Sequence, residues 1–314
     1  MDLEDRSRPY IETRFHNSCI NYLGFNSSRE FYNNIKYWVS YDELIRNLKL
    51  TYKNNYLYNN KMKFIIPSFQ RPQGLLDKTL KYLDSMNIDR SDVYVFIRED
   101  DKFLEEYTSI FANIVAIDIK GIGATHNYIT EHFEADEFIV EIDDDLEYIV
   151  DEYRKPIENF RSLCDEMKSK MEEVGCSYGG TYSVANPLFM SKCEKYTTDL
   201  RYCLGCLRFR FIRKDIKVET NYAEDMENCI LHFIRDGKIL KNNHVAPKTK
   251  NYAVGGCCAD GRGFDSEKKD KAYLADKYPC YCRYFERKNG KPDCRIREYK
   301  GSTCKETFKD ISNH

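Results

Sequence analysis

Short apolar runs alternate with amphipathic segments between residues 63 and 143. The apolar runs are typical of buried strands: KFIIPSF (63–69), DVYVFI (92–97), NIVAIDI (113–119) and EFIVEID (137–143). The segments between them have the apolar spacing of helices, at 75–86, 102–111 and 121–133. Strands that alternate with helices through short connections predict an α/β fold with a mostly parallel central sheet and helices on both faces.

The pattern is less regular on either side of this region. Helical spacing returns at 155–175 and 221–238, and strand-like runs lie at 181–190 and 207–214. Residues 1–60 are rich in Asn and Tyr, with a helical pattern at 40–50, whereas the chain after 239 is rich in Gly, Cys and Tyr. We therefore predict three parts: an N-terminal extension (1–60), a main domain (61–256) and a Cys-rich basic C-terminal region (257–314).

Three consecutive aspartates follow the fourth predicted strand. Asp143, Asp144 and Asp145 come after an apolar run, and ligands of parallel sheets bind beyond the carboxyl ends of the strands. Their mutual repulsion must be compensated by a cation or by hydrogen-bond donors. Oxygen ligands at a strand end suit Mg²⁺ or Mn²⁺, so we predict a metal site here. The alternative is a solvated acidic turn.

A glycine-rich turn leads into the third predicted helix. Gly121 and Gly123 would let the backbone approach a ligand, and the helix N-terminus favours anionic groups. The turn does not match the dinucleotide fingerprint, because residue 126 is His, and it has no Walker lysine. His126 and Asn127 could reach a bound nucleotide or sugar from the first helical turns. The alternative is a tight strand-to-helix turn.

An acidic pair begins the predicted helix at 221–238. Glu224 and Asp225 would match the dipole of the helix wherever it lies in the fold. In a cavity, either carboxylate could act as the general base on an acceptor hydroxyl. The sequence leaves both interpretations open.

Composition restricts the class of protein. The chain has 314 residues, 42% of them hydrophobic and 32% charged, with a net charge of −2, as expected for a globular protein with a substantial core. Contact with nucleic acid would need a local basic patch. No stretch approaches the roughly 18 apolar residues of a membrane span, and the N-terminus is polar. We expect an intracellular protein without membrane contact.

Thirteen cysteines are many for such a chain. Their odd number and the polar N-terminus argue against a disulfide framework. Cys203 and Cys206 form a C-x-x-C pair without a second pair at zinc-finger spacing. A structural Zn²⁺ site is open to four later cysteines, and the alternative is buried or free thiols. The four are Cys280, Cys282, Cys294 and Cys304.

The C-terminal region contains a basic, aromatic segment. Residues 277–300 interleave Tyr and Phe with Arg and Lys, a mixture that suits stacking on bases and pairing with phosphates. A solvated basic face is an equally good interpretation.

The order of these motifs resembles that of a known family. It runs IIPSFQRP (65–72), GIGATHNYI (121–129), VEIDDDLE (140–147) and AEDMENCILHFIRDGK (223–238), followed by His244 and a Gly-Gly pair at 255–256. It is similar to the GT-A superfamily of nucleotide-sugar glycosyltransferases. Within it, the chain resembles the phage and viral TET-associated glycosyltransferases, relatives of the base J glucosyltransferase that modify DNA bases.

Members carry an I-P-S-x-x-R strand, a G-x-x-x-x-R-N helix start and a D-D-D strand end. The chain departs from this pattern at His126, where the family has Arg. The positions that fit are Pro67, Ser68, Arg71, Gly121, Asn127 and Asp143–Asp145.

The resemblance implies a GT-A, Rossmann-like fold over about residues 63–256 and a role for each matched residue. Asp143 and Asp145 would hold Mn²⁺ or Mg²⁺ together with His244, and Glu224 or Asp225 would be the base or an acceptor anchor. The nucleotide sugar would contact Pro67, Ser68, Arg71, Gly123, His126, Asn127, Asp143 and Asp144.

The implied reaction moves a sugar from a nucleotide diphosphate sugar, such as UDP-glucose, to a hydroxyl group. In the subfamily this hydroxyl belongs to a 5-hydroxymethylpyrimidine in DNA, inside the cytoplasm or nucleus of a host cell. A protein or glycan acceptor is the alternative. A non-catalytic nucleic-acid-binding protein is a second alternative, but such a module has no use for clustered acids beside a phosphate polyanion.

Overall fold

The computed structural model describes residues 62–111, 113–249 and 256–299. All of them belong to the second of two compact units, Met62–His314. The predicted N-terminal extension, with its helical pattern at 40–50, lies outside the described residues.

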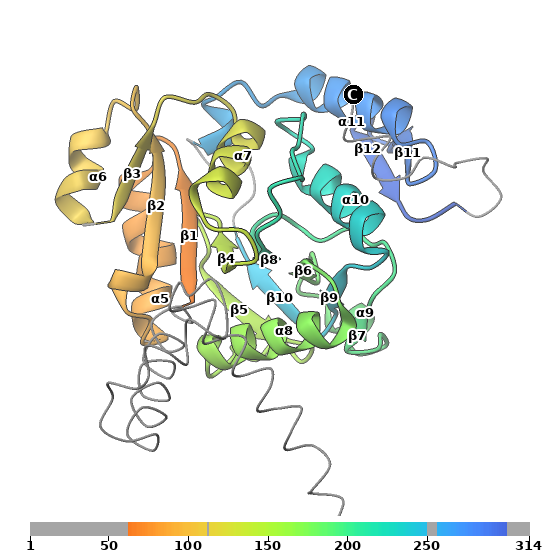
Figure 1. Ribbon diagram of the computed structural model, residues 1–314, viewed down its shortest axis with the longest axis horizontal. Helices are drawn as coiled ribbons and strands as arrows, with labels where there is room; N and C mark the ends of the chain where they lie inside the picture. The colour runs from red at the N-terminus through yellow and green to blue at the C-terminus, as the bar shows by residue number, and fades with distance from the viewer. Residues whose placement is uncertain (1–61, 112, 250–255, 300–314) are drawn as a thin grey trace, which may run out of the picture. The chain divides into compact units, whose positions relative to one another are not determined.

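An eight-stranded sheet forms the centre of this unit (Figure 1). Its strands are, in spatial order, β3 (Ile114–Ile117), β2 (Val93–Arg98), β1 (Lys63–Ser68), β4 (Phe138–Ile142), β8 (Leu207–Phe211), β6 (Tyr178–Thr181), β9 (Leu240–Asn242) and β7 (Tyr196–Thr197). The first four are parallel neighbours, and β6 and β9 are also parallel. β8 runs antiparallel to both β4 and β6, and β7 runs antiparallel to β9. The predicted α/β fold with a mostly parallel sheet is confirmed.

Helices cover both faces of the sheet, because successive strand residues point to opposite sides. Phe64 of β1 packs on Phe160, whereas the next residue, Ile65, packs in a separate cluster with Ile129. The first face is covered by α4 (Pro72–Leu75), η2 (Leu76–Leu80), α5 (Lys81–Ser85), α6 (Leu104–Ile110) and α8 (Phe160–Val174). The second face is covered by α7 (Ile122–His132) and α10 (Glu224–Asp236).

Local signals explain where two of these helices begin and end. The Asn159 side chain accepts a hydrogen bond from the Ser162 amide and caps the start of α8. Gly175 ends α8 and Gly237 ends α10, both in the left-handed conformation that glycine adopts without strain.

The predicted strand at 181–190 is wrong. The chain leaves the sheet after Thr181 and forms the short helix α9 (Pro187–Met190). The Asn186 side chain accepts a hydrogen bond from the Leu188 amide, and Pro187 occupies the first helical turn. This local N-capping chemistry prevails over the strand-like composition of the segment.

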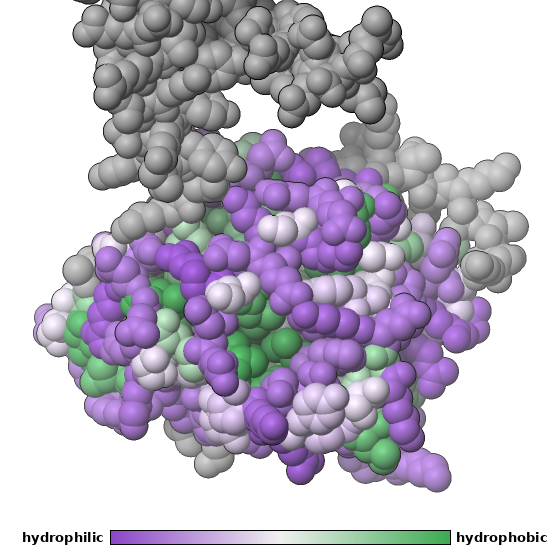
Figure 2. Space-filling model, turned by 90° about the horizontal axis from the view of Figure 1, so that it is seen from below, coloured by the Kyte–Doolittle hydropathy of each residue, from purple (hydrophilic) through white to green (hydrophobic). Residues whose placement is uncertain are grey.

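The remaining elements lie outside the central sheet. They are η3 (Arg90–Asp92), the pair β5 (Tyr148–Asp151) and β10 (Val245–Lys248), η4 (Gly256–Cys258), α11 (Phe264–Lys277), and the hairpin of β11 (Cys282–Glu286) and β12 (Pro292–Ile296). Residues of α11 and of the hairpin share a buried cluster with α10. In the described residues, no helix is long and apolar enough to cross a membrane. The face of the molecule in Figure 2 is mostly hydrophilic, with small hydrophobic areas.

Candidate active site

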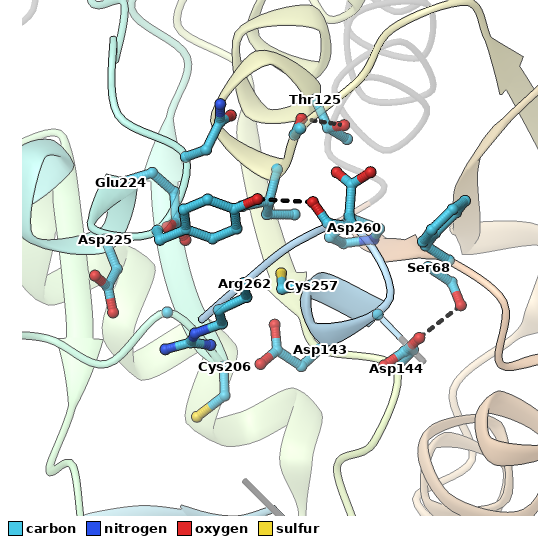
Figure 3. A pocket seen from close by; sticks show the side chains of 18 of the residues that line it. Ser68, Thr125, Asp143, Asp144, Cys206, Glu224, Asp225, Cys257, Asp260 and Arg262 are labelled. Carbon is cyan, nitrogen blue, oxygen red and sulfur yellow. Dashed lines mark hydrogen bonds between the residues drawn. The ribbon is translucent and has the colours of Figure 1, made fainter. Parts of the chain in front are cut away.

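A cavity lies where the carboxyl ends of β1 to β4 meet, and three parts of the chain form its walls (Figure 3). The strand ends contribute Ser68, Phe96, Arg98, Ile117 and Asp143–Asp145. The opposite wall consists of residues from the segment before β8 and from the start of α10. The third wall is the segment from Gly256 to Arg262. The cavity is thus at the edge of the sheet where the sequence predicted a ligand.

The β1 end of the cavity holds two of the three aspartates. Asp144 accepts hydrogen bonds from Ser68 Oγ at 2.6 Å and from Arg71 Nη1 at 2.9 Å. Arg71 Nη1 lies 3.4 Å from Asp145 Oδ2. Burial raises the pKa of both carboxyl groups, and the charge of Arg71 opposes this rise. Ser68, Arg71 and Asp144, far apart in the sequence, therefore form one contact group.

Asp143 is in a different environment from its two neighbours. Burial and the charges of Asp145 and Asp144 raise its pKa to about 7 against the weaker opposing effect of Arg208. A carboxylate in such surroundings is stabilised by a cation, and carboxylate oxygens suit Mg²⁺ or Mn²⁺. In the part of the chain that the structure describes, no group of three or more His, Cys, Asp or Glu side chains could hold a metal ion. Such ions commonly bind one or two carboxylates together with water and phosphate oxygens, which fits Asp143 and Asp145.

The acidic pair at the start of α10 faces the same cavity. Figure 3 shows Glu224, Asp225 and Asp143 around one space. The Asp225 carboxylate accepts hydrogen bonds from the Tyr202 hydroxyl and from the Met226 amide. The Glu224 carboxylate lies 3.6 Å from Arg208 Nη2. Burial, and then the charge of Asp225, raise the pKa of Glu224, while Arg208 opposes the rise. A raised pKa is typical of carboxyl groups that transfer protons at neutral pH.

A fully buried charge network lies directly beneath Glu224. Glu141 contacts Arg210 Nε at 2.7 Å, Arg208 Nε at 3.5 Å and His126 Nδ1 at 2.9 Å. Arg208 Nη2 also lies 2.9 Å from His126 Nε2. Burial and the charge of Arg208 lower the pKa of His126 to about 4, so this ring is neutral at pH 7. Burial alone would raise the pKa of Glu141, but Arg210, His126 and Arg208 together hold it well below its usual range.

Replacing Glu141 with Gln should lower the free energy of unfolding by about 3–5 kcal/mol, because two buried guanidinium groups would lose their shared counter-charge. Urea denaturation at pH 7 measures this loss. The matched control is Glu137→Gln, which removes a partly exposed pair with Lys63 at 2.6 Å and should cost less than about 1 kcal/mol. Equal losses in the two variants would contradict the importance of the buried network.

The structure places three predicted ligand residues away from the cavity surface. His126 faces the buried network, and the Asn127 side chain donates to and accepts from the backbone of Val218. At Gly123, a Cβ atom would lie 2.0 Å from the Thr220 carbonyl oxygen, so this glycine allows two parts of the chain to approach each other. Of the glycine-rich turn, Gly121 lines the cavity, together with Ile122 and Thr125.

His244 is likewise not brought to the aspartates. Its Nε2 lies 2.9 Å from the Cys193 carbonyl oxygen, and its Nδ1 lies 3.5 Å from Glu152. These contacts hold the ring between the turn after β5 and the segment after α9, outside the cavity lining. Of the three predicted metal ligands, Asp143 and Asp145 line the cavity and His244 does not.

Sequence reasoning missed four charged residues that line the cavity: Arg98, Arg208, Asp260 and Arg262. Arg98 stacks on the Phe69 ring at 4.3 Å and pairs with Asp260. Arg208 carried a signal, since LRFRF places arginines at alternate positions of an apolar strand. The segment with Asp260 and Arg262 lacks periodicity, and nothing in its pattern pointed to the cavity.

The cysteines are mostly free. Nine described cysteines are unpaired thiols, and Cys280 is disulfide-bonded. Among the described cysteines, Cys280 is therefore an exception to the prediction that disulfides are absent. A cysteine in a disulfide has no thiolate, so the zinc set that includes Cys280 is not formed. Cys304, the last member of that set, lies outside the described residues.

Comparison with known proteins retrieves similar structures but no related sequences. No protein-family model and no curated protein matches the chain. A crystal structure of S. aureus TarS in complex with UDP-GlcNAc is 13% identical, with a TM-score of 0.46 over 68% of this chain and 66% of that one. The mannosyltransferase PcManGT from Pyrobaculum calidifontis, in complex with GDP-Man and Mn²⁺, is 11% identical, with a TM-score of 0.41 over 58% and 56%.

Glucosyl-3-phosphoglycerate synthase from Mycobacterium tuberculosis, in complex with Mn²⁺, UDP and glucosyl-3-phosphoglycerate, is 12% identical, with a TM-score of 0.43 over 76% of this chain and 87% of that one. The chain spans about two thirds of residues 1–349 of TarS, 40% of the TarS chain, and little more than half of PcManGT. At these levels of identity and superposition, the function of the chain rests on the chemistry of its own cavity.

Proposed function

We propose that the chain is a metal-dependent glycosyltransferase of the GT-A type, which moves a sugar from a nucleotide diphosphate sugar to a hydroxyl group. One observation carries this proposal. Buried aspartates at the ends of parallel strands face a glutamate with a raised pKa across a cavity that also contains several arginines. The aspartates can bind a divalent cation, the arginines can bind two phosphates, and the glutamate can accept the proton of a hydroxyl group.

The metal ion would bind to Asp143 and Asp145. When bound, it supplies positive charge to the diphosphate, which gains negative charge as the sugar leaves. Asp144 is already held by Ser68 and Arg71 and would orient the donor sugar. The identity of the metal, Mn²⁺ or Mg²⁺, is part of the test below.

The nucleotide would occupy the part of the cavity beyond β1, β2 and β3. This part is lined by Pro67, Phe69, Phe96 and Ile117, whose apolar surfaces suit a flat base, and by Arg98. Arg262 belongs to the third wall and pairs with Glu267 at 2.9 Å, and its guanidinium group can also bond to a phosphate oxygen.

The acceptor hydroxyl would lie next to Glu224. Its carboxylate takes the proton as the oxygen attacks the sugar, and Arg208 holds the carboxylate in place from beneath. Asp225, already bonded to Tyr202, is the less available base and would position the tyrosine.

We further propose a 5-hydroxymethylpyrimidine in DNA as the acceptor, on the basis of the β11–β12 hairpin. Arg283 and Arg295 are cross-strand partners on an exposed face, where like charges destabilise each other unless an anion binds. The guanidinium groups of Arg283 and Arg297 lie 4.0 and 4.7 Å from the centre of the Tyr299 ring. Among the described residues, no carboxylate lies within ion-pair distance of these three arginines, whereas Arg287 pairs with Asp293 at 2.6 Å.

Replacing both Arg283 and Arg295 with Gln should weaken DNA binding and flatten its salt dependence, by a slope of roughly 0.9 for each lost phosphate contact. Fluorescence anisotropy of a labelled hydroxymethylated duplex over a range of salt concentrations measures this slope. Arg287→Gln is the control, because its charge is already neutralised by Asp293. An unchanged slope in the double variant would exclude the hairpin as a DNA contact.

A donor screen tests the function itself. The protein is incubated with several nucleotide sugars and Mn²⁺ or Mg²⁺, and nucleotide diphosphate release is recorded with and without hydroxymethylated DNA. Release that depends on the metal is the expected result. Transfer to a protein or glycan in place of DNA would keep the enzyme proposal and remove the DNA acceptor. No release with any donor would overturn the proposal.

A further inference from the structure

A second pocket lies next to the cavity and shares the Tyr202 side chain with it. It is formed where the chain leaves β6 and turns into α9, and β9 supplies its floor. Its lining includes Tyr182, Val184, Phe189, Arg201, Lys241 and Asn243. We call it the Lys241 pocket. Since the Tyr202 hydroxyl donates to Asp225, the pocket adjoins the Glu224 side of the cavity.

The Lys241 ammonium group is the first sign of a ligand. The residue is 7% exposed, and its Nζ donates to the Tyr202 carbonyl oxygen at 2.6 Å and lies 5.1 Å from the centre of the Tyr182 ring. In the part of the chain that the structure describes, no carboxylate pairs with it. A buried charge without a counter-charge is costly, and an anion in the pocket would remove that cost.

Asn243 gives an independent sign. It is 1% exposed, and its Nδ2 donates to the Glu194 carbonyl oxygen at 2.9 Å and to Thr197 Oγ1 at 3.2 Å. These two bonds fix the amide, and its Oδ1 is buried with no hydrogen-bond partner among the described residues. A buried acceptor of this kind is normally satisfied, so a donor such as a ligand hydroxyl fits here.

The rim adds an apolar surface and a second cation. Val184 and Phe189 are large hydrophobic residues that are 65% and 55% exposed. Arg201, which pairs with Asp199, stands at the edge of the pocket. A ligand that carries an anionic group, a hydrogen-bond donor and a flat or apolar part would find a partner for each.

We propose that the Lys241 pocket is an acceptor subsite that binds a phosphate group of the acceptor molecule. The phosphate contacts Lys241 and Arg201, a hydrogen-bond donor of the ligand such as a base N–H bonds to Asn243 Oδ1, and a ring packs on Tyr182. This inference rests on the proposed glycosyltransferase function and deepens it. The phosphate could belong to either of two acceptors: in DNA it is a backbone diester, and in a mononucleotide it is a monoester.

The test compares Lys241→Met, which keeps the length and apolar stem of the side chain, with the wild type. The control is Lys238→Met, whose exposed ammonium group donates to the Val174 carbonyl oxygen. The first two probes are a hydroxymethylated oligonucleotide and the same oligonucleotide with neutral methylphosphonate linkages beside the modified base. The other two are 5-hydroxymethyl-dCMP and the corresponding nucleoside, which lacks the phosphate. Binding is measured by competition, and KM and kcat are measured separately.

Lys241→Met should weaken binding of the phosphate-bearing probe about tenfold or more, mainly through KM, and Lys238→Met should not. The methylphosphonate linkages should cause a similar loss in the wild type, a measurement that does not depend on how well the variant folds. They should cause little further loss in Lys241→Met. If Lys241→Met binds only the oligonucleotide more weakly, the phosphate in the pocket is the backbone diester. If it also binds the mononucleotide more weakly, the pocket accepts the monoester.

Metal-dependent hydrolysis of the donor without acceptor should be the same in the wild type and in Lys238→Met. If the wild type releases nucleotide diphosphate neither with nor without acceptor, the glycosyltransferase function is refuted. If release is present but neither phosphate-bearing probe is bound more tightly by the wild type than by Lys241→Met, the subsite is refuted and the function stands.

Discussion

Replacing Asp143 with Asn should lower turnover on the order of 10³-fold, because the variant loses a metal ligand at the point where charge develops on the diphosphate. Removing divalent ions from the wild type with EDTA should have a similar effect. Steady-state release of nucleotide diphosphate, with each donor that the screen identifies, measures both losses.

The same substitution should leave the fold intact. Folding raises the pKa of Asp143 to about 7, so without metal the folded chain holds the neutral carboxyl better than the carboxylate. Above the unfolded pKa of about 3.9, the charged form therefore costs stability, and this cost grows until the pH passes the folded pKa. Asn has no charge, so the free energy of unfolding at pH 7 should not fall.

Asp165→Asn, on the exposed side of α8, is the control for the loss of a negative charge and should retain full activity. Full activity of Asp143→Asn, or of the wild type in excess EDTA, would rule out the metal role.

Replacing Glu224 with Gln should lower kcat by about 10²–10⁴-fold, the usual contribution of a positioned general base, while donor binding persists. The amide keeps the shape of the side chain beside Arg208 but cannot accept the proton. Glu173→Gln, on the exposed surface of α8, is the matched control. Activity within a few-fold of the wild type would assign the base to another group.

The pH dependence separates the two carboxylates at the start of α10. A base must be ionised, and the raised pKa of Glu224 means that its ionised fraction increases at a higher pH than that of an ordinary glutamate. The wild-type kcat should therefore rise with pH through this shifted transition, and the rise should disappear in Glu224→Gln. Asp225→Asn should keep the rise at a lower rate, since it disturbs Tyr202 and leaves the base in place, and should move the rise to lower pH, since it removes a charge that raises the pKa of Glu224.

The alternation of strands and helices and the place of the aspartates could be predicted from the sequence, because both depend on local periodicity and on the edge at which parallel strands end. The strand that precedes Asp143 is apolar at almost every position, as a central parallel strand must be. The segment from Tyr182 to Met190 was mispredicted because its apolar residues lie in a loop and in a short helix that begins at Asn186 and Pro187.

The roles of His126, Asn127 and Gly123 could not be predicted, because they depend on what packs against α7. All three face the segment around Val218 and Thr220 or the buried network, which the chain reaches some ninety residues later. Side chains in the first turn of a helix point in several directions, and no local sequence pattern predicts which of them face a ligand. Arg208 and Arg210 are different, since two arginines at alternate positions of a buried strand indicate buried partners of opposite charge.

The contact between Arg71 and Gly256 limits how the active site can be divided. A Cβ atom at residue 256 would lie 2.4 Å from a terminal nitrogen of Arg71, and the Gly256 amide donates to the Phe69 carbonyl oxygen at 2.8 Å. The loop after β1 is thus in direct contact with a segment that follows it by almost two hundred residues. For protein engineering, the aspartate-bearing half is therefore not a portable module: grafted alone into another scaffold, it would lack one wall of its own cavity.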